Sequence, residues 1–348
     1  MNFLKDVTKG LDNTNLLSEG GNSSEYSGTI DTGSYILNAA ISGSIYGGVP
    51  NNKITAFAGE SATGKTFFVL GVLKRFLDDN PTGGVIYFDT EAAVTKDMME
   101  TRGIDTKRVA ISEPSSIEEF RTNATRILTT YLDSDEKPPM MMVLDSLGML
   151  SSAKELADVE AGTDKRDMTK AQLLRGTFRV LSLKLAKANV PLLVTNHVYD
   201  VVGAYIPTKE ISGGSGLKYA ASSIAMLSKK KDKDGTAVVG NIIKINMHKS
   251  RFTKEQTKVE VKLSFDKGLD RYYGLLDLAE KYDIIKKVST RYELPDGRKV
   301  FGKAINEKPE EYFTPEILAQ LEEAAQMEFT YGREPEPVEE MEVENDEV

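Results

Sequence analysis

The stretch Gly59–Thr66 reads GESATGKT and fits the pattern G-x-x-x-x-G-K-[ST] between a β-rich run and a helical one. In that context the glycines let backbone N–H groups curve around a phosphate, and the start of the helix adds a favourable dipole. Lys65 can reach the outer phosphates of a nucleoside triphosphate, and the Thr66 hydroxyl can bind Mg²⁺. The predicted nucleotide-binding residues are Gly59, Glu60, Ser61, Ala62, Thr63, Gly64, Lys65 and Thr66.

Two acidic residues follow other apolar runs. Asp145 ends the run MMMVLD, and Glu91 follows YFDT. The carboxyl ends of parallel strands share one edge of a sheet, so we expect both carboxylates near the phosphates. Asp145 could hold Mg²⁺ through water, or it could only cap a turn. Glu91 could orient and deprotonate a water molecule, or it could belong to the first turn of the next helix.

One of the two histidines of the chain, His197, ends the apolar run LLVTNH. The Gly-containing run VYDVVGAYIPTKEISGG follows it directly. Considered alone, such a histidine more often caps the end of a strand. Its imidazole can also hydrogen-bond a phosphate oxygen and report on that phosphate to the segment that follows.

The elements that would position these residues alternate along the chain from 54 to 196. The β-rich runs are KITAFAG, GVIYFDTE, RVAIS, MMMVLDS and PLLVTN, with helical stretches between them. This alternation predicts a mostly parallel sheet with helices on both faces. The later runs GNIIKINM and TKVEVKLSF alternate apolar and polar residues, so we expect an antiparallel pair that extends the sheet.

Composition divides the chain into four predicted parts. The last fifteen residues, Glu334–Val348, carry eight acids and no base, and so account for nearly all of the net charge of −9. Such a tail is expected to be disordered, and it either is simply solvated or competes with an anionic ligand. The predicted parts are an N-terminal oligomerisation segment (1–33), an α/β core (34–275), a small α+β module (276–332) and the acidic tail (333–348).

Composition also bears on the cellular setting. The 348 residues are 40% apolar and include no cysteine, which excludes disulfides and thiolate metal sites. The start MNFLKDVTKG lacks the apolar core of a signal peptide, and no run is long enough to span a bilayer. We therefore expect a cytoplasmic protein with no membrane partner.

The motifs together resemble one family. Their order, GESATGKT, YFDTE, VLDSLG, TNH and SGGSGLKYAAS, is similar to that of the RecA-type recombinases, above all the members from T-even phages. The resemblance covers Ile30 to Lys281. It implies a RecA-like P-loop ATPase core that uses ATP and Mg²⁺. It also implies helical filaments on single-stranded DNA that pair this strand with homologous duplex DNA and exchange strands.

The resemblance also assigns roles to residues. Asp145 becomes the Mg²⁺-linked acid, Glu91 the catalytic base and His197 the sensor of the γ-phosphate. Lys249 and Arg251, in HKSR, match a pair of cations that reach the ATP of a neighbouring subunit. Tyr273 matches an adenine-stacking position. Met98 departs from the pattern, because bacterial members have an aromatic residue there, and this puts the base selectivity in doubt.

Two DNA-binding loops are implied, at about 151–168 and 198–212. The basic candidates have an alternative as ordinary solvated charges, and the first loop is rich in acids, which disfavours phosphate binding. Tyr205 and Ile206 could stack on bases or wedge between them without sequence preference. The DNA-binding candidates are Lys154, Lys165, Arg166, Arg175, Arg179, Tyr205, Ile206, Lys209, Gly213 and Gly214.

The predicted function is therefore a DNA-dependent ATPase that acts as a recombinase, hydrolysing ATP to ADP and phosphate. The predicted partners are single-stranded DNA, homologous duplex DNA, further copies of the chain, a single-strand-binding protein and a loader protein. One alternative is a hexameric helicase motor with the same fold, which should carry a large extra domain. Another is a nucleotide-gated mediator without pairing activity, against which Glu91 argues.

Overall fold

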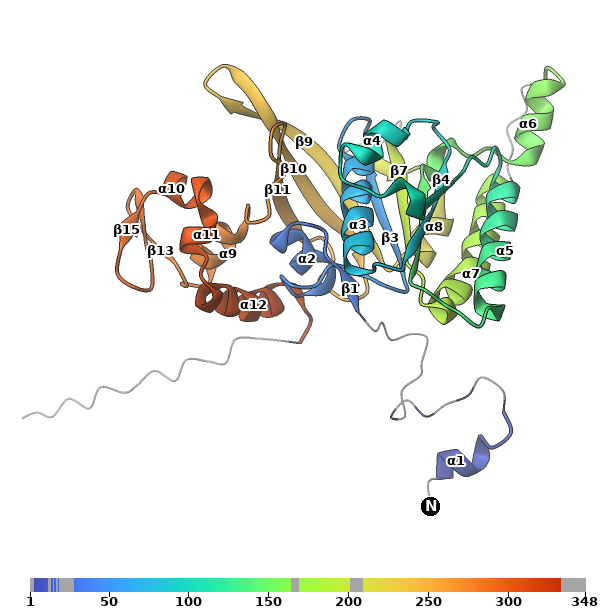
Figure 1. Cartoon of the computed structure of the whole chain (residues 1–348), viewed down its shortest axis with the longest axis horizontal. Helices are drawn as coiled ribbons and strands as arrows, with labels where there is room; N and C mark the ends of the chain where they lie inside the picture. Colours follow the sequence, from blue (N-terminus) through green and yellow to red (C-terminus); the bar gives the residue numbers. More distant parts are fainter. Residues whose placement is uncertain are drawn as a thin grey trace, which may run out of the picture.

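The computed structural model describes residues 3–11, 14, 16, 18, 28–163, 169–200 and 209–332 (Figure 1). A ten-stranded sheet forms the centre of this described part. Its main path runs in the order β12 (Gly268–Leu269), β11 (Lys258–Ser264), β10 (Ala237–Ser250), β9 (Ser223–Asp234), β3 (Ile54–Gly59), β7 (Leu192–Asp200), β6 (Met140–Asp145), β4 (Gly84–Asp89) and β5 (Val109–Ser112). The remaining strand, β8 (Lys209–Ile211), pairs with β7.

The six strands from β9 to β5 along this path are parallel, and β10, β11 and β12 add antiparallel neighbours. This confirms the predicted mostly parallel sheet with an antiparallel extension. The sequence pattern does not predict β9 as a strand of the parallel set. The second half of β9 is the lysine-rich run SKKKDKD, which extends into an exposed hairpin and so lacks the apolar pattern of a buried strand.

Helices cover both faces of the sheet, so successive side chains of a strand enter two separate cores. Phe57 of β3 packs in one core with Phe68 of the helix α3 (Lys65–Asp79). Ala56, its neighbour in the chain, packs in the other core with Phe120 of α5 (Ile117–Asp133) and Phe178 of α7 (Lys170–Ala188). The helices around the sheet are α2 (Tyr35–Ser42), α3 (Lys65–Asp79), α4 (Lys96–Glu100), α5 (Ile117–Asp133), α6 (Ala153–Glu160), α7 (Lys170–Ala188) and α8 (Ser215–Ala220).

The C-terminal region is α+β, as predicted. Thr314 caps α12 (Pro315–Phe329) by accepting a hydrogen bond from the Ile317 backbone N–H at 3.4 Å. Leu321 and Phe329 of α12 belong to the same apolar core as Leu37 of α2, which lies between this region and the sheet (Figure 1). The elements are α9 (Leu275–Lys281), the small sheet β13 (Lys286–Val288), β14 (Arg291–Glu293) and β15 (Lys299–Val300), and α10 (Gly302–Glu307), α11 (Pro309–Tyr312) and α12 (Pro315–Phe329). The domain boundaries stay predictions.

Near the N-terminus, α1 (Phe3–Val7) exposes Phe3, Leu4 and Val7. The strands β1 (Thr29–Ile30) and β2 (Val49–Pro50) form a small sheet beside α2. The acidic tail from 333 to 348 lies outside the described residues.

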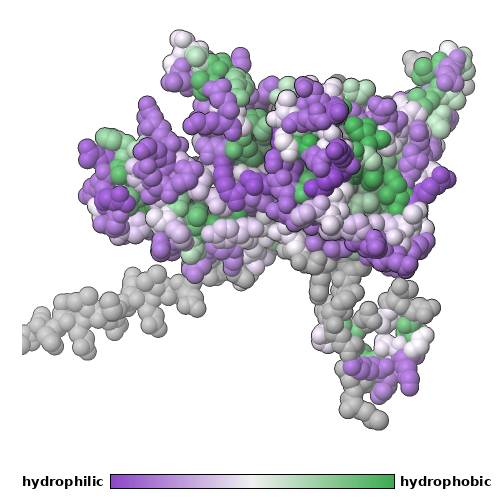
Figure 2. All heavy atoms as spheres, viewed as in Figure 1, coloured by the Kyte–Doolittle hydropathy of each residue, from purple (hydrophilic) through white to green (hydrophobic). Residues whose placement is uncertain are grey.

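Most of the surface in Figure 2 is hydrophilic, with hydrophobic side chains at the tip of the β9–β10 hairpin, where Val238 is exposed. Within the described ranges, no helix is long and apolar enough to cross a membrane.

Candidate active site

The phosphate loop lies where β3 ends at Gly59 and α3 begins at Lys65. Gly59 is required by its surroundings, because an added Cβ would lie 2.6 Å from the Thr63 hydroxyl and 2.8 Å from the Leu227 carbonyl oxygen. Gly64 has a φ of +94°, which side chains disfavour. The loop is therefore shaped to present backbone N–H groups to an anion, as the sequence predicts.

Lys65 is buried and folds back over this loop. Its Nζ donates to the carbonyl oxygens of Gly59 at 3.1 Å and Glu60 at 2.9 Å. Burial lowers the pKa of Lys65, and the charges of Glu91 and Asp145 oppose that shift. The ammonium can therefore exchange two carbonyl partners for phosphate oxygens without moving to a new part of the molecule.

Asp145 ends β6 beside the first turn of α3. Its Oδ2 accepts hydrogen bonds from the Thr66 hydroxyl at 2.8 Å and the Tyr87 hydroxyl at 2.7 Å, and its Oδ1 accepts one from the Thr195 hydroxyl. The structure thus brings together the two residues predicted to serve Mg²⁺. A hydroxyl and one carboxylate fit this ion, which commonly takes few protein ligands and completes its shell with water and phosphates.

No group of three or more acidic, histidine or cysteine side chains in the described residues could enclose a metal alone. No motif in the sequence predicts Tyr87 and Thr195 as residues of this site. Their signal is weak, since each is one hydroxyl in an apolar strand.

Glu91 lies just beyond β4 at the same edge of the sheet. Its Oε1 accepts a hydrogen bond from the Ser146 hydroxyl at 2.6 Å and lies 2.9 Å from His197 Nε2. Burial acts to raise the pKa of Glu91, but the hydrogen bonds from Ser146 and His197 outweigh it and hold the pKa below its ordinary value. Glu91 is therefore ionised near neutral pH, as a proton acceptor must be.

The alternative of a glutamate in the first turn of the next helix is wrong. Helix α4 begins at Lys96, and Thr95 caps it by accepting from the Met98 backbone N–H.

His197 is not at a strand end, because β7 continues to Asp200. Its backbone carbonyl accepts from Ser212 N at 2.9 Å, within a hairpin formed by β7 and β8. The same residue lies opposite Gly59 of the phosphate loop in the β3–β7 register. His197 therefore connects three features: the phosphate loop, the predicted base Glu91 and the hairpin that carries the second predicted DNA loop.

The predicted DNA-binding residues are spread more widely. Arg175 donates to the Ser215 hydroxyl at 3.3 Å, next to Gly213 and Gly214 and so beside the exit of the hairpin. Lys209, in β8, forms an ion pair with Glu60 of the phosphate loop. Lys154 lies exposed on α6, and Arg179 lies on α7 at the other edge of the sheet. Lys165, Arg166, Tyr205 and Ile206 lie outside the described residues.

Lys249 and Arg251 lie at the end of β10, at the edge of the sheet opposite the phosphate loop. Lys249 Nζ donates to the carbonyl oxygens of Lys218 at 2.6 Å and Tyr219 at 3.1 Å, and Arg251 Nη2 donates to that of Tyr219 at 3.2 Å. Burial and the charge of Arg251 lower the pKa of Lys249 to about 8. These two predicted ATP contacts are therefore not part of the phosphate site of their own chain.

Tyr273 is half-buried on the side of the sheet formed by β11 and α9. Burial and the charges of Glu260 and Asp277 raise its pKa. Met98 lies in α4 and packs partly against the core around α3. The adenine-stacking role of Tyr273 stays a prediction.

A parallel sheet with a phosphate loop, a Mg²⁺-type acid and polar residues at one carboxyl edge defines a P-loop nucleotide-binding protein. The family model for the RecA N-terminal domain matches residues 1–270, and the chain belongs to the RecA family.

Three relatives illustrate the similarity. The recombination and repair protein of enterobacteria phage T4 is 30% identical over 253 residues, which cover 72% of this chain and 63% of the phage protein. Protein RecA of Chloroherpeton thalassium is 29% identical over 302 residues, covering 84% and 80% of the two chains. Protein RecA of Malacoplasma penetrans is 27% identical over 292 residues, covering 81% and 84%. The match to the phage T4 protein spans less than two thirds of that protein. These matches confirm the resemblance predicted from the motifs.

Proposed function

We propose that this protein is an ATP-dependent DNA recombinase. Copies of the chain assemble head to tail into a helical filament on single-stranded DNA, pair that strand with a homologous duplex and exchange strands. Membership of the RecA family supports this proposal, as does the similarity to a phage protein named for recombination and repair. A single-strand-binding protein and a loader protein would assist assembly.

The main support for the proposal is that two groups of residues expected to bind one ATP lie at opposite edges of the sheet. The phosphate loop follows β3 at its carboxyl end, whereas Lys249 and Arg251 lie beside the amino end of β3, where Thr55 pairs with Ser223 of β9 and Ser223 pairs with Ser250 of β10. Six strand residues separate these edges by about 20 Å. One ATP can contact both only if it lies between two copies, and such a contact repeats without closing a dimer.

ATP hydrolysis follows from the residues at the phosphate loop. Lys65 and the loop N–H groups would bind the phosphates, while Thr66 and Asp145 would hold Mg²⁺, which would supply positive charge to offset that of the phosphates. Glu91 accepts a proton from the attacking water, and Ser146 and His197 fix its carboxylate in place. Lys249 and Arg251 of the next copy stabilise charge that develops in the transition state, as an arginine finger does.

Coupling to DNA follows from the contacts of His197. The His197 side chain contacts Glu91 and its backbone carbonyl accepts from Ser212 N, so His197 gives a change at the γ-phosphate a direct route to the β7–β8 hairpin. Lys209 belongs to that hairpin and Arg175 lies beside its exit, and both would contact DNA phosphates. The exposed apolar residues of α1 would dock on the adjacent copy.

Strand exchange tests the proposal directly. With ATP and Mg²⁺, the protein should convert a single-stranded circle and a linear duplex into joint molecules only when the two are homologous. A heterologous duplex and the Lys65→Ala variant are the controls. Unwinding of the duplex without regard to homology would instead identify a helicase motor, and ATP binding without joint molecules would identify a mediator.

A further inference from the structure

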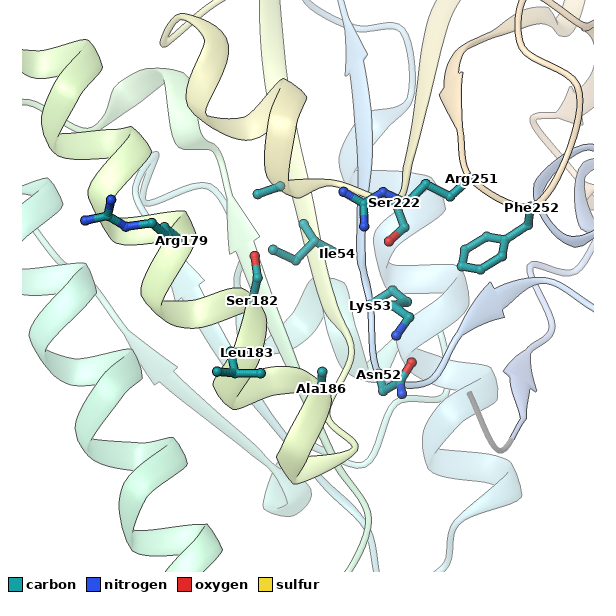
Figure 3. Close-up of a pocket in the computed structure, with 11 residues that line it drawn as sticks. Asn52, Lys53, Ile54, Arg179, Ser182, Leu183, Ala186, Ser222, Arg251 and Phe252 are labelled. Atoms are coloured by element: carbon teal, nitrogen blue, oxygen red, sulfur yellow. The ribbon is translucent and has the colours of Figure 1, made fainter. Parts of the chain in front are cut away.

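A cavity of about 470 Å³ lies at the amino edge of the sheet, between the start of β3, the turn before β9, the end of β10 and helix α7 (Figure 3). Its charged lining residues in the described part of the chain are all cations: Lys53, Arg179 and Arg251. Asn52, Ser182 and Ser222 add polar groups, and Phe252 closes one side. This composition suits an anion of nucleotide size.

The register of the sheet explains why two of these cations lie at the same edge. Thr55 of β3 lies opposite Ser223 of β9, which lies opposite Ser250 of β10. Lys53 and Arg251 are therefore both just beyond the same edge, separated by one strand or roughly 10 Å. In Figure 3, Lys53 and Arg251 lie on either side of Ser222, whereas Arg179 points away from both.

The charge of Arg251 affects the pKa values of two lysines near this edge. Burial and the charge of Arg251 lower the pKa of Lys53. Burial and the same guanidinium lower the pKa of Lys249, and the charge of Glu255 partly offsets this shift. Arg251 thus lies near both lysines, and an anion placed beside it would relieve its repulsion with each of them.

We infer that Lys53 is a third cation that reaches the ATP phosphates carried by the adjacent copy, together with Lys249 and Arg251. This inference rests on the proposed function, because it requires head-to-tail assembly. Lys53 cannot serve the phosphate loop of its own chain, since the length of β3 separates them. A DNA phosphate is a poorer candidate, because the hairpin of the second DNA loop leaves the opposite edge of the sheet.

The first test compares DNA-dependent ATP turnover in Lys53→Met, Lys53→Arg and wild-type protein. Loss of a hydrogen bond to a charged group should slow Lys53→Met by about tenfold or more, whereas Lys53→Arg should keep most of the rate. Binding of a fluorescent ATP analogue to the DNA-free protein should be unchanged in both. The matched control is Lys137→Met, which removes an exposed lysine just before β6 at the same edge but outside this cavity.

The second test shows whether Lys53 acts across the interface. Lys53→Met keeps an intact phosphate loop, and Lys65→Ala keeps an intact Lys53. In an equal mixture of the two variants, about a quarter of the interfaces should therefore join an intact phosphate loop to an intact Lys53 of the next copy. ATP turnover of the mixture should therefore exceed that of either variant alone and approach about a quarter of the wild-type rate.

The possible outcomes separate the inference from the proposed function. Wild-type protein without DNA-dependent turnover would contradict the proposed function itself. Active wild-type protein with Lys53→Met as active as Lys137→Met would overturn only the inference. A defective Lys53→Met that the Lys65→Ala partner does not restore would show that Lys53 acts within its own chain, which also overturns it.

Discussion

Glu91→Gln is expected to bind ATP and single-stranded DNA as the wild type does and to lose most ATP turnover, by roughly 10²–10⁴-fold. The amide can still accept a hydrogen bond from Ser146, so the local structure should persist. It cannot take a proton from water at neutral pH. Binding should be unaffected, because Lys65, Thr66 and the loop N–H groups are the groups expected to contact the phosphates.

The measurement is steady-state ATP hydrolysis at saturating DNA, together with the affinity for a non-hydrolysable ATP analogue. Glu113→Gln, which neutralises an exposed glutamate before α5, is the matched control and should be fully active. Turnover of Glu91→Gln near that of Glu113→Gln would remove Glu91 from the role of base.

His197→Ala is expected to bind ATP but to lose the gain in DNA affinity that ATP produces. A nucleotide shifts the hairpin only through contacts that differ between the ATP and ADP states. His197 is the residue that touches Glu91 through its side chain and Ser212 through its backbone. The ratio of DNA affinities with a non-hydrolysable ATP analogue and with ADP should fall to about one, from a typical coupling of roughly 5–150-fold.

His197→Gln should keep part of this ratio, since an amide can also hydrogen-bond a phosphate oxygen. Tyr199→Phe is the control, because Tyr199 lies in the same strand of the hairpin. The hydroxyl that this change removes donates to Glu210 and not to Glu91. An unchanged ratio in His197→Ala would leave the histidine with only a structural place in β7. Turnover should also fall in His197→Ala, because Glu91 loses one of the two groups that hold it.

Much of the fold follows from local patterns. Short apolar runs between helical stretches predicted the parallel strands, because a strand covered on both faces must be apolar nearly throughout. The phosphate loop was equally predictable, since its chemistry depends on residues that are adjacent in the chain. The strand β9 was missed because its lysines extend beyond the covered part of the sheet, where the apolar pattern ends.

Contacts between distant residues required the structure. Glu91 and His197 are 106 positions apart, and only the order of β4, β6 and β7 in the sheet brings them to one edge. The sheet keeps other predicted ATP contacts apart. The resemblance connects Lys249 and Arg251 with ATP, but both lie at the edge of the sheet far from the phosphate loop. Lys53 gave no signal in the sequence, because its position is defined by the register of β3, β9 and β10.

ATP that lies between head-to-tail copies must build a filament. Electron microscopy of the protein with single-stranded DNA and a non-hydrolysable ATP analogue would show this assembly. The wild type should form open helical filaments along the DNA, and Arg251→Ala, which keeps the phosphate loop but removes a contact from the adjacent copy, should form few or none. Closed rings in the wild type, or normal filaments in Arg251→Ala, would rule out ATP as the contact between head-to-tail copies.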